Sequence, residues 1–169
     1  MKKRLYLLNG MVALLLLAGC MGYRLGGGSP EGIETVAMAP VLNRTTEPAI
    51  ELQVTRAMRE RIQFDGRMKL VNDPENADAV MEISLTGYRA SPIAYQSELR
   101  TTPDIYRLRV TGTAKLRSTK TGETIATSST YGEATFNFQD DLTSSKRDAL
   151  PGAAAEIAKF MLDDLIEQW

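Results

Sequence analysis

Apolar and polar side chains alternate along several segments of this chain, as they do in β-strands that have one buried face. The clearest case is residues 106–117, where one phase is apolar and the other contains four cations. Residues 33–41 and 79–88 alternate with the same period of two. Because successive strand side chains point to opposite faces, these segments predict strands whose apolar phase lies in a core.

Two weaker segments complete the predicted sheet. Residues 118–122 have the composition of a hairpin connection, and the Thr/Ser-rich residues 123–138 behind it predict a partner strand. Residues 67–71 predict a short strand that ends in a turn at residues 72–76. The polar phase of these strands favours an antiparallel sheet that is covered on one side only.

Apolar residues recur at helical spacing between Ile50 and Ile62, with charged residues largely on the other side. This pattern predicts an amphipathic helix that ends near Gly66, because glycine commonly follows the last helical residue. Thr46 is the candidate N-cap, which places Pro48 in the first turn, where proline is tolerated.

A second apolar stripe runs from Leu150 to Leu165 and predicts a C-terminal helix. Asp148 is its candidate N-cap, which places Pro151 in the first turn. We expect the apolar stripes of both helices to belong to the core and to bind no ligand.

The predicted element order is β-α-β-β-β-α, an α+β fold with two helices packed on one face of a four-stranded, mainly antiparallel sheet. In this scheme the second strand is long and is broken at the Asp73–Pro74 turn. Residues 90–104 contain two prolines among mixed polar residues and predict a long loop. Loops of this length inside a compact domain are usually functional or mobile.

The first twenty residues have the pattern of a targeting signal. Three basic residues precede a mostly apolar run at residues 5–17, and small residues then lead to Cys20. This is typical of a secretory signal peptide, and the run is too short for a membrane-spanning helix, which needs roughly 20 apolar residues. The letters LAGC at residues 17–20 resemble the lipobox of bacterial lipoproteins, in which the cysteine thiol is acylated and the chain is cut before it.

The lipobox resemblance divides the chain into a signal peptide at residues 1–19, a lipidated Cys20 with a glycine-rich tether at residues 20–30, and one domain at residues 31–169. Two or three acyl chains anchor a protein stably, whereas one gives only marginal binding. The two residues directly after Cys20 are Met21 and Gly22, so neither is an aspartate. Since an aspartate there resembles an inner-membrane retention signal, its absence favours the outer membrane. The alternative is an ordinary cleavage site near an unrelated cysteine.

Composition argues against several classes of function. Removal of the first 19 residues leaves 150 residues, enough for one domain with a core, and takes the net charge from −1 to −4. That charge disfavours nucleic-acid binding, which expects a basic domain. The chain has no histidine, which removes His-based triads and imidazole metal sites, and its single cysteine forms no disulfide once it is lipidated. We expect no metal and no cofactor other than the lipid on Cys20.

Four further stretches carry a resemblance over almost the whole mature chain. They are GYRLGG at residues 22–27, PVLNRTTEP at residues 40–48, RMKLVNDPENADAVMEISLTGY at residues 67–88 and YRLRVTGTAKLRSTKTGETI at residues 106–125. In their order and spacing behind a lipobox, they resemble the LPS-assembly lipoprotein family, LptE.

The resemblance implies a small outer-membrane lipoprotein, lipid-anchored on the periplasmic side, with two helices on a four-stranded sheet. It implies a position inside the lumen of the β-barrel of the LPS translocon (LptD-like), where the lipoprotein helps the barrel to fold and plugs it. It also implies binding of lipopolysaccharide as the glycolipid passes to the outer leaflet, and no catalysed reaction. No nucleic acid is expected as a partner.

The basic phase of residues 106–117 suits the phosphates and carboxylates of LPS, because arginine binds phosphate through paired hydrogen bonds. The alternative is that these cations are solvent-side charges paired with Glu82, Glu123 or Glu133 on neighbouring strands. The candidate LPS-binding residues are Arg107, Arg109, Lys115, Arg117 and, in the adjacent hairpin, Lys120.

The second candidate site is the contact with the barrel. A Thr/Ser-rich polar face and the loop at residues 91–103 suit a polar barrel lumen, whereas the alternative is that threonine is simply a good strand former. The candidate partner-contact residues are Tyr95, Thr111 and Thr113.

Two other functions stay open at this point. A pilotin-like or scaffold lipoprotein of another envelope or secretion assembly would have the same anchor and size but a different partner. A hydrolase needs a nucleophile with a positioned base, and the absence of histidine makes this the least favoured function.

Overall fold

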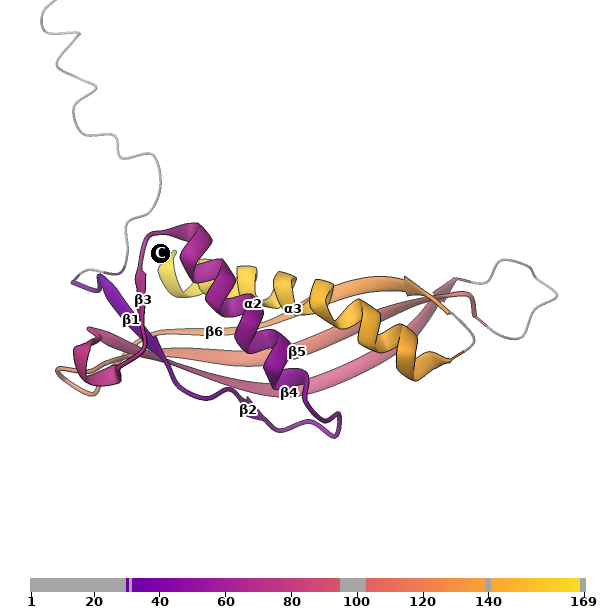
Figure 1. Ribbon diagram of the computed structural model, residues 1–169, viewed down its shortest axis with the longest axis horizontal. Helices are drawn as coiled ribbons and strands as arrows, with labels where there is room; N and C mark the ends of the chain where they lie inside the picture. The colour runs from indigo at the N-terminus through magenta and orange to yellow at the C-terminus, as the bar shows by residue number, and fades with distance from the viewer. Residues whose placement is uncertain (1–29, 31, 95–102, 139–140, 168–169) are drawn as a thin grey trace, which may run out of the picture.

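The computed structural model describes residues 30, 32–94, 103–138 and 141–167. These residues form an α+β domain in which two long helices cover one face of a sheet, as predicted (Figure 1). Cys20, its signal peptide and tether, and Tyr95 lie outside them, so the division of the chain into segments stays a prediction. The elements are β1 (Thr35–Met38), β2 (Leu42–Asn43), α2 (Ile50–Asp65), β3 (Lys69–Val71), the 3-10 helix η2 (Pro74–Asn76), β4 (Ala79–Ala94), β5 (Ile105–Ser118), β6 (Thr124–Asn137) and α3 (Leu142–Ile166).

The predicted four-stranded, mainly antiparallel sheet is wrong in two respects. The sheet in the described residues has six strands in the order β3-β1-β4-β5-β6, with β2 also paired to β4. Strands β4, β5 and β6 form an antiparallel meander, but β1 pairs in parallel with both β3 and β4, and β2 pairs in parallel with β4. Because β1 lies between β3 and β4, these two strands are separate and are not one long strand broken at the Asp73–Pro74 turn.

Strands β1 and β2 together form one extended run along the edge of β4. The amide of Ala39 donates to the carbonyl of Met81 at 3.0 Å, and the amide of Arg44 donates to the carbonyl of Leu85 at 2.9 Å. Along one edge of a regular strand every second amide donates, so the odd-numbered Ala39 and the even-numbered Arg44 belong to different phases. The run therefore divides into two short strands.

Strand β4 is longer than predicted, and the expected loop at residues 90–104 is correspondingly shorter. The register with β5 continues through Ala90 opposite Leu108 and Pro92 opposite Tyr106. Proline disfavours a central strand, but this part of β4 pairs with β5 alone, and an edge strand leaves one side of the backbone free.

Helix α2 ends as predicted and begins differently. Gly66 follows the last residue at a φ of 73°, the left-handed conformation that glycine adopts without strain. At the other end the N-cap is Ala49, with no side-chain cap bond, so Thr46 is not the cap. The turn before α2 is held instead by Asn43, whose side-chain amide donates to the carbonyl of Glu47 at 2.8 Å.

Helix α3 begins a full two turns before the predicted cap. Its N-cap is Asp141, whose carboxylate accepts from the amides of Thr143 at 3.1 Å and Ser144 at 2.9 Å. Asp148 and Pro151 therefore lie inside the helix, not at its start. Pro151 is exposed, so water can bond the carbonyl that its missing N–H leaves free.

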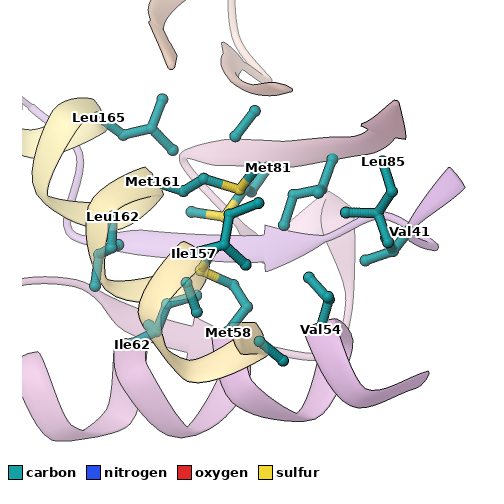
Figure 2. Packing of buried hydrophobic residues seen from close by; sticks show 14 of the residues in the cluster. Val41, Val54, Met58, Ile62, Met81, Leu85, Ile157, Met161, Leu162 and Leu165 are labelled. Carbon is teal, nitrogen blue, oxygen red and sulfur yellow. The ribbon is translucent and has the colours of Figure 1, made fainter. Parts of the chain in front are cut away.

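The core lies between the helices and the sheet, and both apolar helix stripes belong to it, as predicted. Figure 2 shows Met58 of α2, Met161 of α3 and Met81 of β4 within one hydrophobic cluster, and all three are fully buried. Helix α3 packs against β5 and β6 as well as α2. On the other face of the meander the described residues place no helix, and we call it the open face (Figure 1).

Candidate functional site

The open face is formed by every second residue of β4, β5 and β6. Along β5 the core-facing residues from Leu108 to Leu116 are buried, while the alternate residues from Arg107 to Arg117 are exposed or half-buried. The two predicted phases of this strand are therefore confirmed. The predicted basic residues that lie on the open face are Arg107, Arg109, Lys115 and Arg117.

Two of these cations share one carboxylate. Arg109 donates to Glu133 of β6, directly opposite in the register, at 2.6 Å, and the Nε of Arg107 lies 3.5 Å from the other carboxylate oxygen. The guanidinium of Arg109 also lies 4.2 Å from the centre of the Tyr131 ring, a distance suited to a cation–π contact. The cross-strand pairing with Glu133 considered above is confirmed for both arginines.

Arg117 and Lys120 are also neutralised by nearby carboxylates. Arg117 lies 2.8 Å from Glu82 of β4. Lys120, in the β5–β6 hairpin, lies 3.3 Å from Asp78. Glu123, the third carboxylate considered from sequence, forms no ion pair within the part of the chain that the structure describes.

Asp78 has a structural role of its own. Its carboxylate accepts from the hydroxyl of Thr35 at 2.8 Å, from the amide of Thr35 at 3.0 Å and from the amide of Glu34 at 3.2 Å. These hydrogen bonds, with a smaller contribution from Lys120, lower the pKa of Asp78 from 3.8 to about 2. Asp78 therefore holds the start of β1 against β4.

Lys115 is the exception among the five predicted basic residues. It forms no ion pair with any residue in the described ranges. It lines a pocket of about 300 Å³ at the junction of β2, β4 and β5, together with Arg44, which also has no carboxylate partner among the described residues. Between the two cations lies a row of three paired residues, one from each strand: Leu42 pairs with Ser84, and Ser84 pairs with Thr113.

A fifth cation on the open face was not predicted. Arg89 of β4 lies directly opposite Arg109. The register shifts between Leu85 and Gly87, and this bulge exchanges the faces of the residues behind it. Before the bulge odd-numbered residues face the core, and after it Tyr88 packs against the core and Arg89 faces outward. The alternation of apolar and polar residues in the sequence does not reveal the bulge, so it does not predict that Arg89 faces outward.

Thr111 and Thr113, the candidate partner-contact residues of β5, lie on the open face, opposite Gly87 and Ser84 respectively. Both are half-buried. Their role in a contact with another protein stays a prediction.

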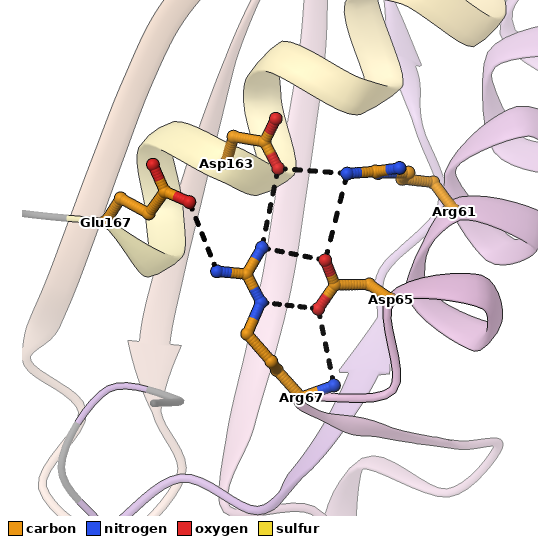
Figure 3. Close-up of polar contacts among 5 residues, drawn as sticks. All are labelled: Arg61, Asp65, Arg67, Asp163 and Glu167. Atoms are coloured by element: carbon orange, nitrogen blue, oxygen red, sulfur yellow. Dashed lines mark hydrogen bonds and ion pairs between the residues drawn. The ribbon is translucent and has the colours of Figure 1, made fainter. Parts of the chain in front are cut away.

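A second charged cluster lies where α2 and α3 end side by side (Figure 3). Arg67, just after α2, holds both carboxylate oxygens of Asp65 at 2.6 and 2.7 Å. Arg67 also lies 3.5 Å from Asp163 of α3 and 3.3 Å from Glu167, the residue after α3, and Arg61 of α2 lies 3.1 Å from Asp163. The charges in this cluster satisfy one another, which indicates a structural role in joining the helices.

The pKa values within this cluster agree with that role. The hydrogen bonds from Arg67 are the main cause that lowers the pKa of Asp65, and those to Asp65 raise the pKa of Arg67. A general acid or base needs a pKa near the working pH, and both shifts lead away from neutrality.

The described residues show no arrangement for binding a metal, since they contain no cluster of three or more acidic, cysteine or histidine side chains placed around one point. Within the same residues, neither α2 nor α3 contains a stretch long and apolar enough to cross a bilayer.

Solved structures resemble this chain at low sequence identity. A protein from Xanthomonas campestris is 11% identical, the alignment covers 80% of this chain and 83% of that one, and the TM-score is 0.53. The rare lipoprotein B from Shewanella oneidensis is 12% identical over 77% of this chain and 92% of that one, with a TM-score of 0.47. Because the Xanthomonas campestris protein is only 11% identical, its likeness shows that the fold is shared and says nothing about function.

Comparison at the level of sequence is more specific. No curated protein matches the chain. A family model described as LptE, lipopolysaccharide-assembly, matches residues 33–168. The match begins just before β1 and continues past the end of α3, so it spans the whole described domain.

Proposed function

The chain belongs to the lipopolysaccharide-assembly family LptE, and on that premise we propose that it is a non-enzymatic outer-membrane lipoprotein that partners and plugs the β-barrel of the LPS translocon. In this role it aids assembly of the barrel and binds lipopolysaccharide during its insertion in the outer leaflet. The observation that carries the proposal is the family match over residues 33–168. It confirms the resemblance found in the sequence.

The proposed anchor is the lipid on Cys20, which holds the domain on the periplasmic side of the outer membrane. The supporting observations are the lipobox at residues 17–20 and the glycine-rich residues that follow it. Between Cys20 and Ile33, which is buried in the core, there are 12 residues, and an extended chain spans about 3.3–3.6 Å per residue. That length allows the domain to reach a partner several nanometres from its anchor.

The proposed LPS-binding surface is the open face, with its cations on β5. The distribution of charge supports it, because arginine and lysine side chains lie together on a face that neither α2 nor α3 covers. The pairs with Glu82 and Glu133 reduce the net charge there without removing it, since Glu133 serves both Arg107 and Arg109.

The proposed barrel contact uses Thr111 and Thr113 of the open face together with Tyr95. Hydroxyl side chains both donate and accept hydrogen bonds, so they suit the polar interior of a large barrel. Threonines next to the cations would allow one face to serve both the protein and the glycolipid.

Affinity purification of the tagged lipoprotein from outer membranes tests this function. We expect an outer-membrane β-barrel protein as the main co-purified chain, and we expect less of that barrel when the lipoprotein is depleted. The control is the Cys20→Ala variant, which should be lost from the membrane fraction. A secretin or another periplasmic assembly as the stable partner would contradict the proposal and favour a pilotin-like function.

A further inference from the structure

The pocket that contains Lys115 and Arg44 differs from the rest of the open face in its charge. Four of the five predicted basic residues lie against a carboxylate, whereas Lys115 and Arg44 have none among the described residues. The one carboxylate in the pocket lining, Glu82, is bound by Arg117 at 2.8 Å. The pocket therefore has an uncompensated positive charge that an anion would balance.

Hydrogen-bonding groups line the floor of the same pocket. Ser84, Thr86 and Thr113 contribute hydroxyls. The Oγ of Ser84 is shielded from solvent and has no hydrogen-bond partner within the described residues. Buried hydroxyls are almost always bonded, because leaving one unpaired costs free energy. A ligand oxygen above Ser84 would supply the missing partner.

The edge of the pocket is apolar. Leu42 of β2 lies beside Ser84 in the register and is 54% exposed, one of the most exposed large apolar side chains described. An inorganic ion gains no free energy from contact with an apolar side chain, whereas an amphiphile can bury its apolar part against it.

We propose that this pocket binds the phosphate group of an anionic lipid. Phosphate presents several oxygens around one centre, which matches the guanidinium of Arg44, the ammonium of Lys115 and hydroxyl donors from two strands, β4 and β5. Leu42 contacts the apolar part of the same lipid. This inference rests on the proposed function and deepens it, because it assigns the phosphates of a glycolipid to Lys115 and Arg44.

Binding of lipid A to the purified full-length lipoprotein in detergent tests the assignment. The probes are lipid A with its phosphates and the same lipid A after phosphatase treatment, at about 0.15 M salt, where distant charges are screened. We expect Lys115→Gln and Arg44→Gln each to weaken binding of the phosphorylated probe about tenfold, and the double variant to weaken it further. Binding of the dephosphorylated probe should not change.

Two further variants separate the pocket from general effects. Lys69→Gln removes one positive charge from an exposed position on β3 and should bind as the wild type does. Ser84→Ala should weaken binding of the phosphorylated probe without lowering the melting temperature, because it removes a hydroxyl that has no partner in the free protein.

Three results would overturn the assignment. The first is unchanged binding by the Lys115→Gln, Arg44→Gln double variant. The second is an equal loss with Lys69→Gln. The third is binding of inorganic phosphate alone with the same dependence on Lys115 and Arg44, which would indicate a soluble oxyanion as the ligand. If the double variant still co-purifies with the barrel in any of these cases, the proposed function stands and only the pocket assignment fails.

Discussion

At the scale of the residue, Gly132 sets how closely α3 approaches the sheet. It lies in β6, where the backbone of α3 passes directly over it. A Cβ built at this position would collide with the backbone of Ala153 and Ile157 and lie 2.8 Å from the Cβ of Ile157. Backbone atoms cannot rotate away as the end of a side chain can, so only glycine fits here.

We therefore expect Gly132→Ala to lower the free energy of unfolding by about 2–3 kcal/mol, because α3 must move off the sheet. Urea denaturation followed by circular dichroism measures this change. The matched control is Gly152→Ala in α3, where the added Cβ would meet only the Cβ of Ala134 at 3.3 Å. Equal denaturation midpoints for the two variants would show that the close approach at Gly132 is unimportant.

The sequence predicts which residues of the candidate site share a face but not how their charges are paired. The alternation along β5 places Arg107 and Lys115 correctly on the polar side. The register places Glu82 directly opposite Lys115, yet Glu82 pairs with Arg117 and Lys115 has no carboxylate partner among the described residues. Only the directions that the side chains take, and not the alternation along the strand, determine this pairing. Arg44 belongs to the pocket through the pairing of β2 with β4, which joins residues about 40 positions apart.

At the scale of the element, the ends of helices differ in how well local sequence predicts them. Gly66 ends α2 as predicted because the left-handed conformation is a property of the residue itself. The start of α3 was misplaced because Pro151 suggested a first turn, whereas Asp141 makes the actual cap seven residues before Asp148. Pro151 is tolerated inside the helix because it lies on the solvent side.

The charged cluster in Figure 3 joins α2 to α3, and Asp65 is its central acid. Its side chain is only 8% exposed and lies between Arg61 and Arg67. We expect Asp65→Asn to lower the free energy of unfolding by about 1–3 kcal/mol, because the change removes the more buried of the two carboxylates, Asp65 and Asp163, that the two arginines share. Chemical denaturation at neutral pH measures the loss.

Glu60→Gln is the matched control for that prediction. Glu60 lies on the same helix and pairs with Arg56 at 2.8 Å, but both side chains are well exposed. Exposed pairs contribute little, so this variant should stay within about 0.5 kcal/mol of the wild type. A loss as large as that of Asp65→Asn would show that charge alone, and not the shielded cluster, determines the effect.

At the scale of the whole molecule, the antiparallel meander could be predicted and the parallel part of the sheet could not. Strands β4, β5 and β6 follow one another directly along the chain, and their alternation is visible in the sequence. Strand β1 lies between β3 and β4, and its partners there are distant in sequence: Thr35 pairs with Lys69, 34 residues further along the chain, and Val36 pairs with Ala79, 43 residues further along. No local pattern encodes so distant a neighbour.

The response of the whole domain to acid follows from its carboxylates. Hydrogen bonds hold the pKa of Asp78 at about 2, and those from Ser144, Thr143 and Arg67 lower the pKa values of Asp141 and Asp65. A group whose pKa is lower in the folded state stabilises the fold above its ordinary pKa, near 4, and loses that contribution as the pH falls through the folded value. Stability should therefore fall between about pH 4 and pH 2.

Urea midpoints measured across pH test this expectation. We expect little change between about pH 6 and pH 8, because the chain has no histidine to titrate there. Asp78→Asn should be less stable than the wild type at neutral pH and should lose less on acidification. A wild-type midpoint that is constant down to pH 2 would contradict the role given to these carboxylates.

Strand β1 has a mechanical consequence for a chain that is held at its N-terminal side. Any tension transmitted through the residues before Ile33 enters the domain at β1, which is hydrogen-bonded to a neighbour along each edge and fixed at Thr35 by Asp78. When the pull runs along the strand, both ladders must shear at once instead of opening one bond after another. The domain should therefore resist unfolding at β1, the strand to which a membrane tether would apply force.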